Sequence, residues 1–378
     1  MGPPAGLCGS AMAKKRQASG GAEPPRQVPR KPVTSYEVAK AAGVSQSAVS
    51  RTFSQRGYVS QETRQRVHKA AKELGFKPNA IARSLITQRS RIIAVVMADL
   101  QYSFYLSILH QLSKAIRAAG YQVLLISIPS SDEIDDYMPD VIAYRVDGII
   151  IASALLSTKA ARLCRDRDIP VVLINRQVTD RGFSSVSADN LFAGRLAAET
   201  LAEAGCRRLA FVAGQRETST SLDREAGFFA RTAELGGKRP LRRDGFFTYD
   251  GGYRAARDLM RLKGPPDGIF CASDIMAMGA LDALRYELGL KVGEDVSVIG
   301  CIDAAEAAWK SFELTTIAVD SAAMSTRAVD LLIEQIERPG TAARRESLPV
   351  RLVRRKTVRP PKSPASAPQA RRDEPTIA

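Results

Sequence analysis

The chain has 378 residues, 45% of them hydrophobic, which is enough to bury the cores of more than one domain. No apolar run approaches the roughly 20 residues that cross a bilayer, and residues 1–32 lack the apolar segment of a secretion signal. We therefore expect no membrane segment and a cytoplasmic location. The five cysteines are odd in number and have no close pair, which predicts reduced thiols, four of them buried, rather than a zinc site.

The net charge of +15 is concentrated near the start of the chain. Residues 1–32 carry six basic side chains and one acidic one, and residues 33–90 carry ten against three. Residues 91–356 are almost neutral, with 35 basic and 34 acidic side chains. The first segment lacks periodicity and is interpreted as a disordered basic tail, but the second has a foldable pattern. Its charge favours a polyanion as partner.

Three short helices are predicted within residues 33–76. The first covers residues 35–42, the second begins at Ser45, and the third begins at Ser60 and ends at Gly75. A serine hydroxyl can accept the unsatisfied N–H groups of a first helical turn, and glycine suits the left-handed position after a last turn.

The first two of these helices have the spacing of a helix-turn-helix. Ala39 supplies a small residue at the crossing, Gly43 the turn and Val49 a core contact. The second helix then leaves polar side chains facing solvent that can reach base edges and phosphates in a major groove. These are Gln46, Ser47, Ser50 and Arg51. The alternative is an ordinary surface helix of a small helical bundle, which leaves the local charge unexplained.

From residue 91 onward, short apolar runs alternate with stretches of helical length. The runs are "RIIAVVMAD", "YQVLLISI", "DGIIIAS", "PVVLINR", "RRLAFVAG", "DGIFCAS" and "VSVIG". This alternation predicts parallel sheets covered by helices. Residues 77–87 are interpreted as a connector, and residues 357–378, with five prolines, as a tail.

Several motifs in this order resemble the lactose-repressor (LacI/GalR-type) family of bacterial transcription regulators. They are "VTSYEVAKAAGVSQSAVSRTF", "PNAIARSL", "SLDREAGF", "ASDIMAMGALDAL" and "VGEDVSVIG", and the resemblance spans residues 33–356. It implies a small all-α helix-turn-helix domain followed by an α/β core of two doubly wound subdomains, like a periplasmic binding protein. The expected division is a tail over 1–32, the DNA-binding domain over 33–78, a hinge helix and linker over 79–90, the effector-binding and dimerisation domain over 91–356, and a Pro-rich tail over 357–378.

The resemblance implies a sequence-specific regulator, a repressor, whose operator binding is controlled by a small molecule. A homodimer on a pseudo-palindromic operator is expected, because one small helix-turn-helix makes few base contacts. No enzyme, cofactor or metal site is expected, since the sequence has two histidines and no phosphate-binding loop or nucleophile motif. The alternative of a transport-type binding protein leaves the DNA-binding pattern unexplained and would require an export signal.

The resemblance also assigns DNA-binding positions. Side chains expected to read bases or hold phosphates are Thr34, Tyr36, Ser45, Gln46, Ser47, Ser50, Arg51, Tyr58 and Thr63. The hinge positions are Asn79, Ala82 and Leu85, of which Leu85 is expected to wedge into the minor groove and kink the central base step.

Effector-binding positions follow from the same resemblance. They are Phe104, Tyr105, Thr220, Arg224, Phe247, Ser273, Asp274 and Asp303. The sequence departs from the family at Ile302, where a ligand-facing aspartate is usual. Loss of that acid beside Arg224 predicts an anionic effector, such as a sugar acid. The alternative is that Asp303 or Asp274 neutralises Arg224 and the site accepts a neutral sugar.

Overall fold

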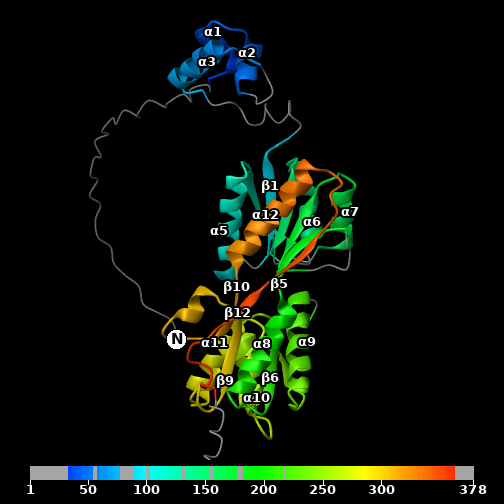
Figure 1. Cartoon of the computed structure of the whole chain (residues 1–378), viewed down its shortest axis with the longest axis vertical. Helices are drawn as coiled ribbons and strands as arrows, with labels where there is room; N and C mark the ends of the chain where they lie inside the picture. The colour runs from blue at the N-terminus through cyan, green and yellow to red at the C-terminus, as the bar shows by residue number, and fades with distance from the viewer. Residues whose placement is uncertain are drawn as a thin grey trace, which may run out of the picture. The chain divides into compact units, whose positions relative to one another are not determined.

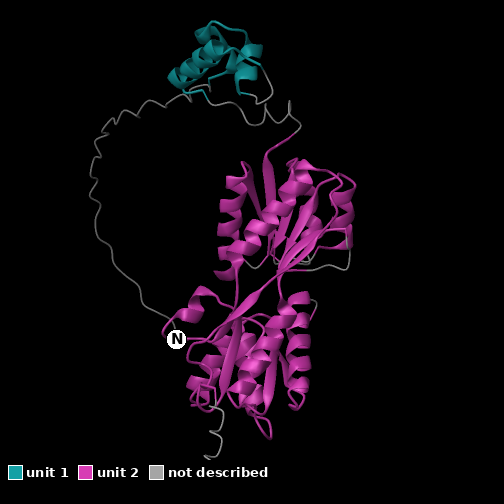
Figure 2. Cartoon of the chain, viewed as in Figure 1, with its two compact units in different colours: residues 1–82 teal, residues 83–378 magenta. Residues whose placement is uncertain are grey.

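The computed structural model describes residues 33–53, 58–76, 89–98, 100, 103–129, 133–152, 156–176, 182–216 and 218–361 (Figure 1). It divides into two compact units, residues 1–82 and 83–378, each considered by itself (Figure 2). The predicted tail over 1–32 lies outside the described residues, as do residues 77–88 of the predicted connector and hinge.

The first unit contains the three predicted helices. They are α1 (Ser35–Ala42), α2 (Gln46–Phe53) and α3 (Gln61–Leu74). The hydroxyls of Ser45 and Ser60 accept from the backbone N–H groups of Ala48 and Thr63, at 3.2 and 3.3 Å. Gly75, which follows α3, is left-handed with a φ of 67°. The helix boundaries are therefore set by the local signals that predicted them.

A small apolar core holds these helices together. Val38 and Ala39 of α1, Val49 of α2, and Val67 and Ala71 of α3 are all buried in it. Gly43 makes the tight turn between α1 and α2 with a φ of 63°. The turn and the small residue Ala39 let the two helices cross closely, which fixes the direction of α2.

The second unit contains two six-stranded sheets. In chain order the strands are β1 (Ile92–Met97), β2 (Gln122–Ser127), β3 (Gly148–Ala152), β4 (Val171–Ile174), β5 (Ser184–Ala188), β6 (Leu209–Ala213), β7 (Leu241–Asp244), β8 (Gly268–Cys271), β9 (Ser297–Ile302), β10 (Thr316–Val319), β11 (Arg345–Leu348) and β12 (Val350–Val353). The first sheet has the order β11-β5-β4-β3-β1-β2, and the second has the order β12-β10-β9-β8-β6-β7. All neighbours are parallel except β10 and β12.

Helices cover both sheets. They are α5 (Ser103–Ala118), α6 (Ile134–Ala143), α7 (Thr158–Arg165), α8 (Asn190–Glu203), α9 (Ser219–Glu234), α10 (Tyr249–Met260), α11 (Asp274–Asp282) and α12 (Ser321–Glu337), with short turns η2 (Ala283–Glu287) and η3 (Ala305–Ala308). We call the first sheet with α5, α6, α7 and α12 the first subdomain. The second sheet with α8 to α11 is the second subdomain (Figure 1).

The strands are apolar on both faces because both faces are covered. In β1, Ile93 and Val95 belong to the same buried cluster as residues of α5. Ala94 and Val96, on the other face, belong to the cluster that includes residues of α6 and α7. The uninterrupted apolar runs of the sequence thus reflect burial on two sides.

The chain passes between the subdomains three times. The crossings lie at Asp189 after β5, at Asp320 after β10 and at Pro349 after β11. The backbone N–H of Asp189 donates to the carbonyl of Leu348 at 2.8 Å, so two of the crossings are bonded to each other. Three adjacent connections join the subdomains while leaving room for a cavity between them.

All seven predicted strand runs form strands, but the predicted C-terminal tail over 357–378 is partly wrong. Thr357 is buried, and its hydroxyl donates to the carbonyl of Val298 at 2.7 Å. Arg359 donates to the carbonyls of Glu294 and Asp295 at 2.7 and 2.6 Å. Residues 357–361 therefore belong to the second subdomain, because backbone and side-chain hydrogen bonds outweigh the proline-rich composition.

The four cysteines that the structure describes, Cys164, Cys206, Cys271 and Cys301, are buried thiols, as predicted. Burial raises the pKa of the Cys164 thiol to about 11. Within the described ranges, no helix is both long and apolar enough to cross a membrane.

Gly194 allows α8 and α9 to pack with their backbones almost in contact. A Cβ there would lie 2.1 Å from the carbonyl oxygen of Arg224. We expect Gly194→Ala to lower the free energy of unfolding of the second unit by about 1–3 kcal/mol, because α9 must move away. Urea denaturation would measure the loss. The control Ala202→Ser adds one atom at an exposed position of α8 and should change the free energy of unfolding by less than about 0.5 kcal/mol. If both variants lost the same free energy of unfolding, the close helix packing at Gly194 would not explain the loss.

Candidate DNA-binding surface and effector cavity

Helix α2 presents a polar face to solvent. Gln46, Ser47, Ser50 and Arg51 are all exposed, whereas Val49 is buried in the core of the first unit. The Arg51 Nε donates to the carbonyl of Ser47 at 3.3 Å, so the guanidinium lies along the helix surface. This arrangement leaves polar groups on the solvent face of α2, and such groups can donate to and accept from base edges.

The expected phosphate-binding residues surround the starts of the three helices. Thr34 caps α1, and its hydroxyl donates to Glu37 at 3.0 Å in a capping box. Ser45 caps α2, and the hydroxyl of Thr63 accepts from Ser60 at the start of α3. Helix N-termini attract anions through their N–H groups and dipole, so this is suitable chemistry for phosphates.

Two tyrosines expected to contact the operator are exposed on the first unit. Tyr36 and Tyr58 are 67% and 94% exposed, although large aromatic side chains are usually at least partly buried. The hinge positions Asn79, Ala82 and Leu85 lie outside the described residues, so their expected contacts remain predictions.

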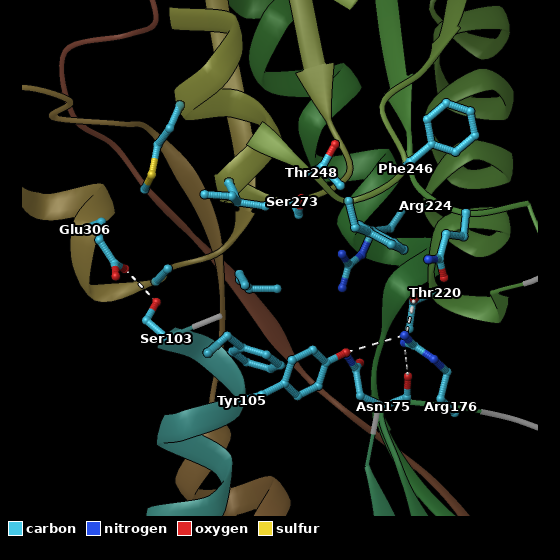
Figure 3. A pocket seen from close by; sticks show the side chains of 17 residues that line it. Ser103, Tyr105, Asn175, Arg176, Thr220, Arg224, Phe246, Thr248, Ser273 and Glu306 are labelled. Atoms are coloured by element: carbon cyan, nitrogen blue, oxygen red, sulfur yellow. Dashed lines mark hydrogen bonds between the residues drawn. The ribbon is translucent and has the colours of Figure 1, made fainter. Parts of the chain in front are cut away.

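A cavity of about 330 Å³ lies between the two subdomains of the second unit (Figure 3). Its walls come from segments that follow the carboxyl ends of β4, β6, β7, β8 and β9, and from the start of α5. In open α/β sheets, ligands bind at this end of the strands, and this volume suits a small molecule.

Six of the eight expected effector-binding residues line the cavity. They are Phe104, Tyr105, Thr220, Arg224, Phe247 and Ser273. Ile302, the residue that departs from the family, lines it as well. The ring of Phe247 lies where a side chain of Gly214 would be, because a Cβ on Gly214 would be 2.1 Å from that ring. The cavity therefore has an apolar wall where an aspartate was expected from the family pattern.

The two expected aspartates do not line the cavity, which corrects that expectation. Asp274 is fully buried behind the wall, where it accepts from the hydroxyl of Thr316 at 2.5 Å and from the N–H of Ala304 at 2.7 Å. Asp303 accepts from the guanidinium of Arg355 at 2.8 Å. Both carboxylates have structural partners elsewhere in the second subdomain.

Arg224 is buried at the cavity wall and forms no ion pair with a described acidic residue, although its charge acts on the buried Asp274 and opposes the rise that burial causes in the pKa of that carboxyl. Its Nε donates to the Oδ1 of Asn190 at 2.8 Å, and its Nη1 donates to the carbonyl of Ala272 at 2.5 Å. The Nη2 is buried and has no hydrogen-bond partner in the described part of the chain. The guanidinium is thus fixed by neutral groups, with one N–H-bearing nitrogen left for a ligand.

A second buried arginine, Arg176, was missed by the sequence analysis. It is 4% exposed, and its Nη1 donates to the carbonyl of Asn175 at 2.9 Å and to the Thr220 hydroxyl at 3.3 Å. Its Nη2 donates to the Tyr105 hydroxyl at 3.4 Å (Figure 3). The signal was the polar pair Asn175–Arg176 directly after a buried parallel strand, a position that faces ligands in this fold class.

The opposite side of the cavity carries an acid. Glu306, on η3, accepts from the hydroxyl of Ser103 at 2.7 Å, and Figure 3 shows this pair across the cavity from Arg176 and Arg224. Two further polar atoms at the cavity walls, Asn175 Oδ1 and Ser273 Oγ, are buried without partners within the described residues. Unsatisfied buried polar atoms are costly, so this set indicates a ligand site.

The fold and the two sites define a regulator with a DNA-binding helix-turn-helix and a small-molecule cavity, and comparisons with known proteins agree. Residues 34–79 match a family model described as bacterial regulatory proteins, lacI family, and residues 198–358 match one described as a periplasmic binding protein-like domain. The chain is 32% identical to the HTH-type transcriptional repressor PurR of Erwinia tasmaniensis, over 83% of this chain and 92% of that protein.

Solved structures are similar over most of the chain. The lac repressor dimer bound to operator and the anti-inducer ONPF has a TM-score of 0.78 and 28% identity, covering 87% of this chain and all of that one. The complex of the transcriptional regulator CelR with cellobiose has a TM-score of 0.66 and 29% identity, covering 86% and 99%. The chain belongs to the lacI family of bacterial regulatory proteins, and is a transcriptional repressor with an effector-binding domain.

Arg51 tests the position of the recognition surface. We expect Arg51→Ala to weaken binding to a native operator by about 1–3 kcal/mol, because a base or phosphate loses its partner. Fluorescence anisotropy with labelled operator would measure this. Arg254→Ala removes the same charge from an exposed position of α10 in the second unit and is the control. Unchanged operator affinity in Arg51→Ala would mean that α2 does not read the DNA.

Asp274 gives the second unit a pH-dependent stability. Burial raises the pKa of its carboxyl to about 6, against the lowering effect of hydrogen bonds from Thr316 and Ala304. Because the pKa is higher in the folded than in the unfolded chain, the contribution to stability grows as the pH falls from 7.5 through 6.

We therefore expect that, between pH 7.5 and pH 5, the free energy of unfolding of the parent rises by about 1–2 kcal/mol relative to that of Asp274→Asn. Urea denaturation at both pH values would measure the difference. Parallel pH profiles for the two proteins would show that Asp274 does not titrate in this range.

Proposed function

We propose that the chain acts in the bacterial cytoplasm as a homodimer on a pseudo-palindromic operator, and that a small organic anion in the cavity controls its operator affinity. The similar lac repressor structure is a dimer bound to operator. A dimer doubles the base contacts of a single helix-turn-helix and matches the symmetry of a palindrome.

The anionic class of the effector rests on one observation, the buried guanidinium of Arg224. A buried charge without a counter-charge is costly, and this cost is offset when a ligand supplies the anion. A carboxylate at the cavity wall can accept from the Arg224 Nη2, which has no partner among the described residues. Such a charge-assisted bond is stronger than one to a neutral hydroxyl.

A neutral sugar is the alternative effector, and the similar CelR structure is a complex with cellobiose. In this chain Asp303 pairs with Arg355, and Asp274 accepts from Thr316. Asp274 acts on Arg224 through its charge but does not hydrogen-bond to it, so the Arg224 Nη2 keeps no protein partner among the described residues. Ile302 replaces the polar group that would face sugar hydroxyls. These features favour an acid, such as a sugar acid, over the neutral sugar.

The other walls suit the non-ionic part of such a molecule. The rings of Phe104 and Tyr105 pack edge to face, 5.3 Å between centroids, at the start of α5. Phe247, Met278 and Ile302 add apolar surface on the second subdomain. A sugar-like skeleton can present its apolar face to these side chains while its acid pairs with Arg224.

The test begins with genomic footprinting by the purified protein, to obtain an operator. Calorimetry then compares matched pairs, each sugar beside its acid, beginning with glucose and gluconate. We expect an acid to bind at least tenfold more tightly than its sugar and to change operator affinity, and Arg224→Met to abolish the difference.

The matched control is Arg254→Met, which removes a guanidinium from an exposed position of α10 that does not line the cavity. It should leave the preference for acids intact. A neutral sugar that binds more tightly than its acid, with Arg224→Met unaffected, would exclude the anionic effector. If the purified protein bound no genomic site, its proposed action on an operator would be excluded.

A further inference from the structure

The cavity holds two buried guanidinium groups, one from each subdomain. Arg176 follows β4 of the first subdomain, and Arg224 lies on α9 of the second. Each has a nitrogen without a hydrogen-bond partner in the described chain, Nε in Arg176 and Nη2 in Arg224. Neither forms an ion pair with a described acidic residue.

The two guanidinium groups are at the same end of the cavity. Arg176 Nη1 donates to the hydroxyl of Thr220 at 3.3 Å. Thr220 and Arg224 are four residues apart on α9, so their side chains lie on the same face one turn from each other. Figure 3 shows both arginines on the α9 side of the cavity.

Two buried cations near each other repel, and burial disfavours both charges. A ligand with a single negative charge would leave one of them uncompensated. Glu306 cannot supply the missing negative charge, because it lies on the opposite side of the cavity, where it accepts from Ser103. Within the described residues that line the cavity, Glu306 is the only acid.

We propose that the effector has a doubly charged anionic head, such as a phosphate monoester, held between Arg176 and Arg224, with a hydrogen-bond-donating tail directed at Glu306. The proposal rests on the proposed function and specifies its ligand. Asn175 Oδ1, which is buried without a partner in the described chain, accepts from a hydroxyl next to the head.

The position of Glu306 distinguishes two kinds of dianion. A phosphate monoester carries both charges at one end, where both arginines are. A dicarboxylate with acids at opposite ends of its chain would place its second carboxylate near Glu306, and like charges repel at that separation. Hydroxyl groups at that end instead donate to the Glu306 carboxylate.

The first test uses sulfate, a compact dianion, on the full chain. Thermal unfolding is followed through the fluorescence of Trp309, the single tryptophan, which belongs to the second unit. At matched ionic strength, sulfate should raise the midpoint of the parent by about 3–6 °C more than acetate or chloride does. Arg176→Met and Arg224→Met should each lose part of this shift, and the double variant all of it.

Arg254→Met is again the control, since it removes an exposed guanidinium that does not line the cavity, and it should keep the full sulfate shift. The control also accounts for the general stabilisation of proteins by sulfate. A sulfate shift that is unchanged in Arg176→Met would overturn the proposal, because Arg176 would then take no part in anion binding.

The second test keeps a six-carbon skeleton and varies the charge. The probes are glucose, gluconate, glucarate and glucose 6-phosphate, in calorimetry with the full chain. We expect glucose 6-phosphate to bind at least tenfold more tightly than gluconate and than glucarate. Glu306→Gln should strengthen glucarate binding at least threefold, because a repelling charge is removed.

The outcomes separate this proposal from the proposed function. If gluconate binds as tightly as glucose 6-phosphate, and both depend on Arg224 but not on Arg176, the effector is a simple anion. The doubly charged head is then wrong and the proposed function stands. If glucose binds most tightly of the four, both fail, while the footprint on the genome still reports whether the chain regulates transcription.

Discussion

The hydrogen bonds that hold Arg224 are the interaction on which the cavity depends. Asn190, at the start of α8, accepts from Nε, and the carbonyl of Ala272, after β8, accepts from Nη1. One side chain of α9 thus joins three segments that follow different strands. The arrangement requires α8 and α9 to approach closely, which Gly194 and Gly227 allow, since a Cβ on either would lie about 2 Å from a carbonyl oxygen of the facing helix. The placement of the cation is therefore a consequence of helix packing.

The backbone around the cavity is held in unusual conformations. Phe246, Phe247 and Ile302 have φ values of 55°, 57° and 109°, and Asn175 has a φ of 56°. Left-handed backbone costs free energy in non-glycine residues, and for bulky residues it persists only where the surroundings fix it. All four residues line the cavity. Strain of this kind concentrates at binding sites, and here it turns Phe247 over Gly214 to form the apolar wall.

Features that depend on local chemistry could be predicted from the sequence. Contacts between residues far apart in the chain could not. Helix caps at Ser45 and Ser60 and the apolar strand runs depend on neighbours in the chain, and they form as expected. Strand β5, "SSVSA", was missed because its serines are polar, although all five residues are buried. The partner of Asp303 is Arg355, 52 residues away, and only the folded chain brings them together. For the same reason Arg176 was missed, since its relation to Thr220 is not local.

Arg176 also bears on how the cavity connects the two subdomains. Its backbone follows β4 of the first subdomain, while its Nη1 bonds to Thr220 on α9 of the second, so this side chain spans the gap directly. The other links include the hydrogen bond from Ser103 of α5 to Glu306 of η3, and the backbone crossings at Asp189, Asp320 and Pro349. A ligand can shift the balance between two arrangements only to the extent that its contacts differ between them. A molecule held by arginines of both subdomains satisfies that condition, because its contacts change whenever one subdomain moves against the other.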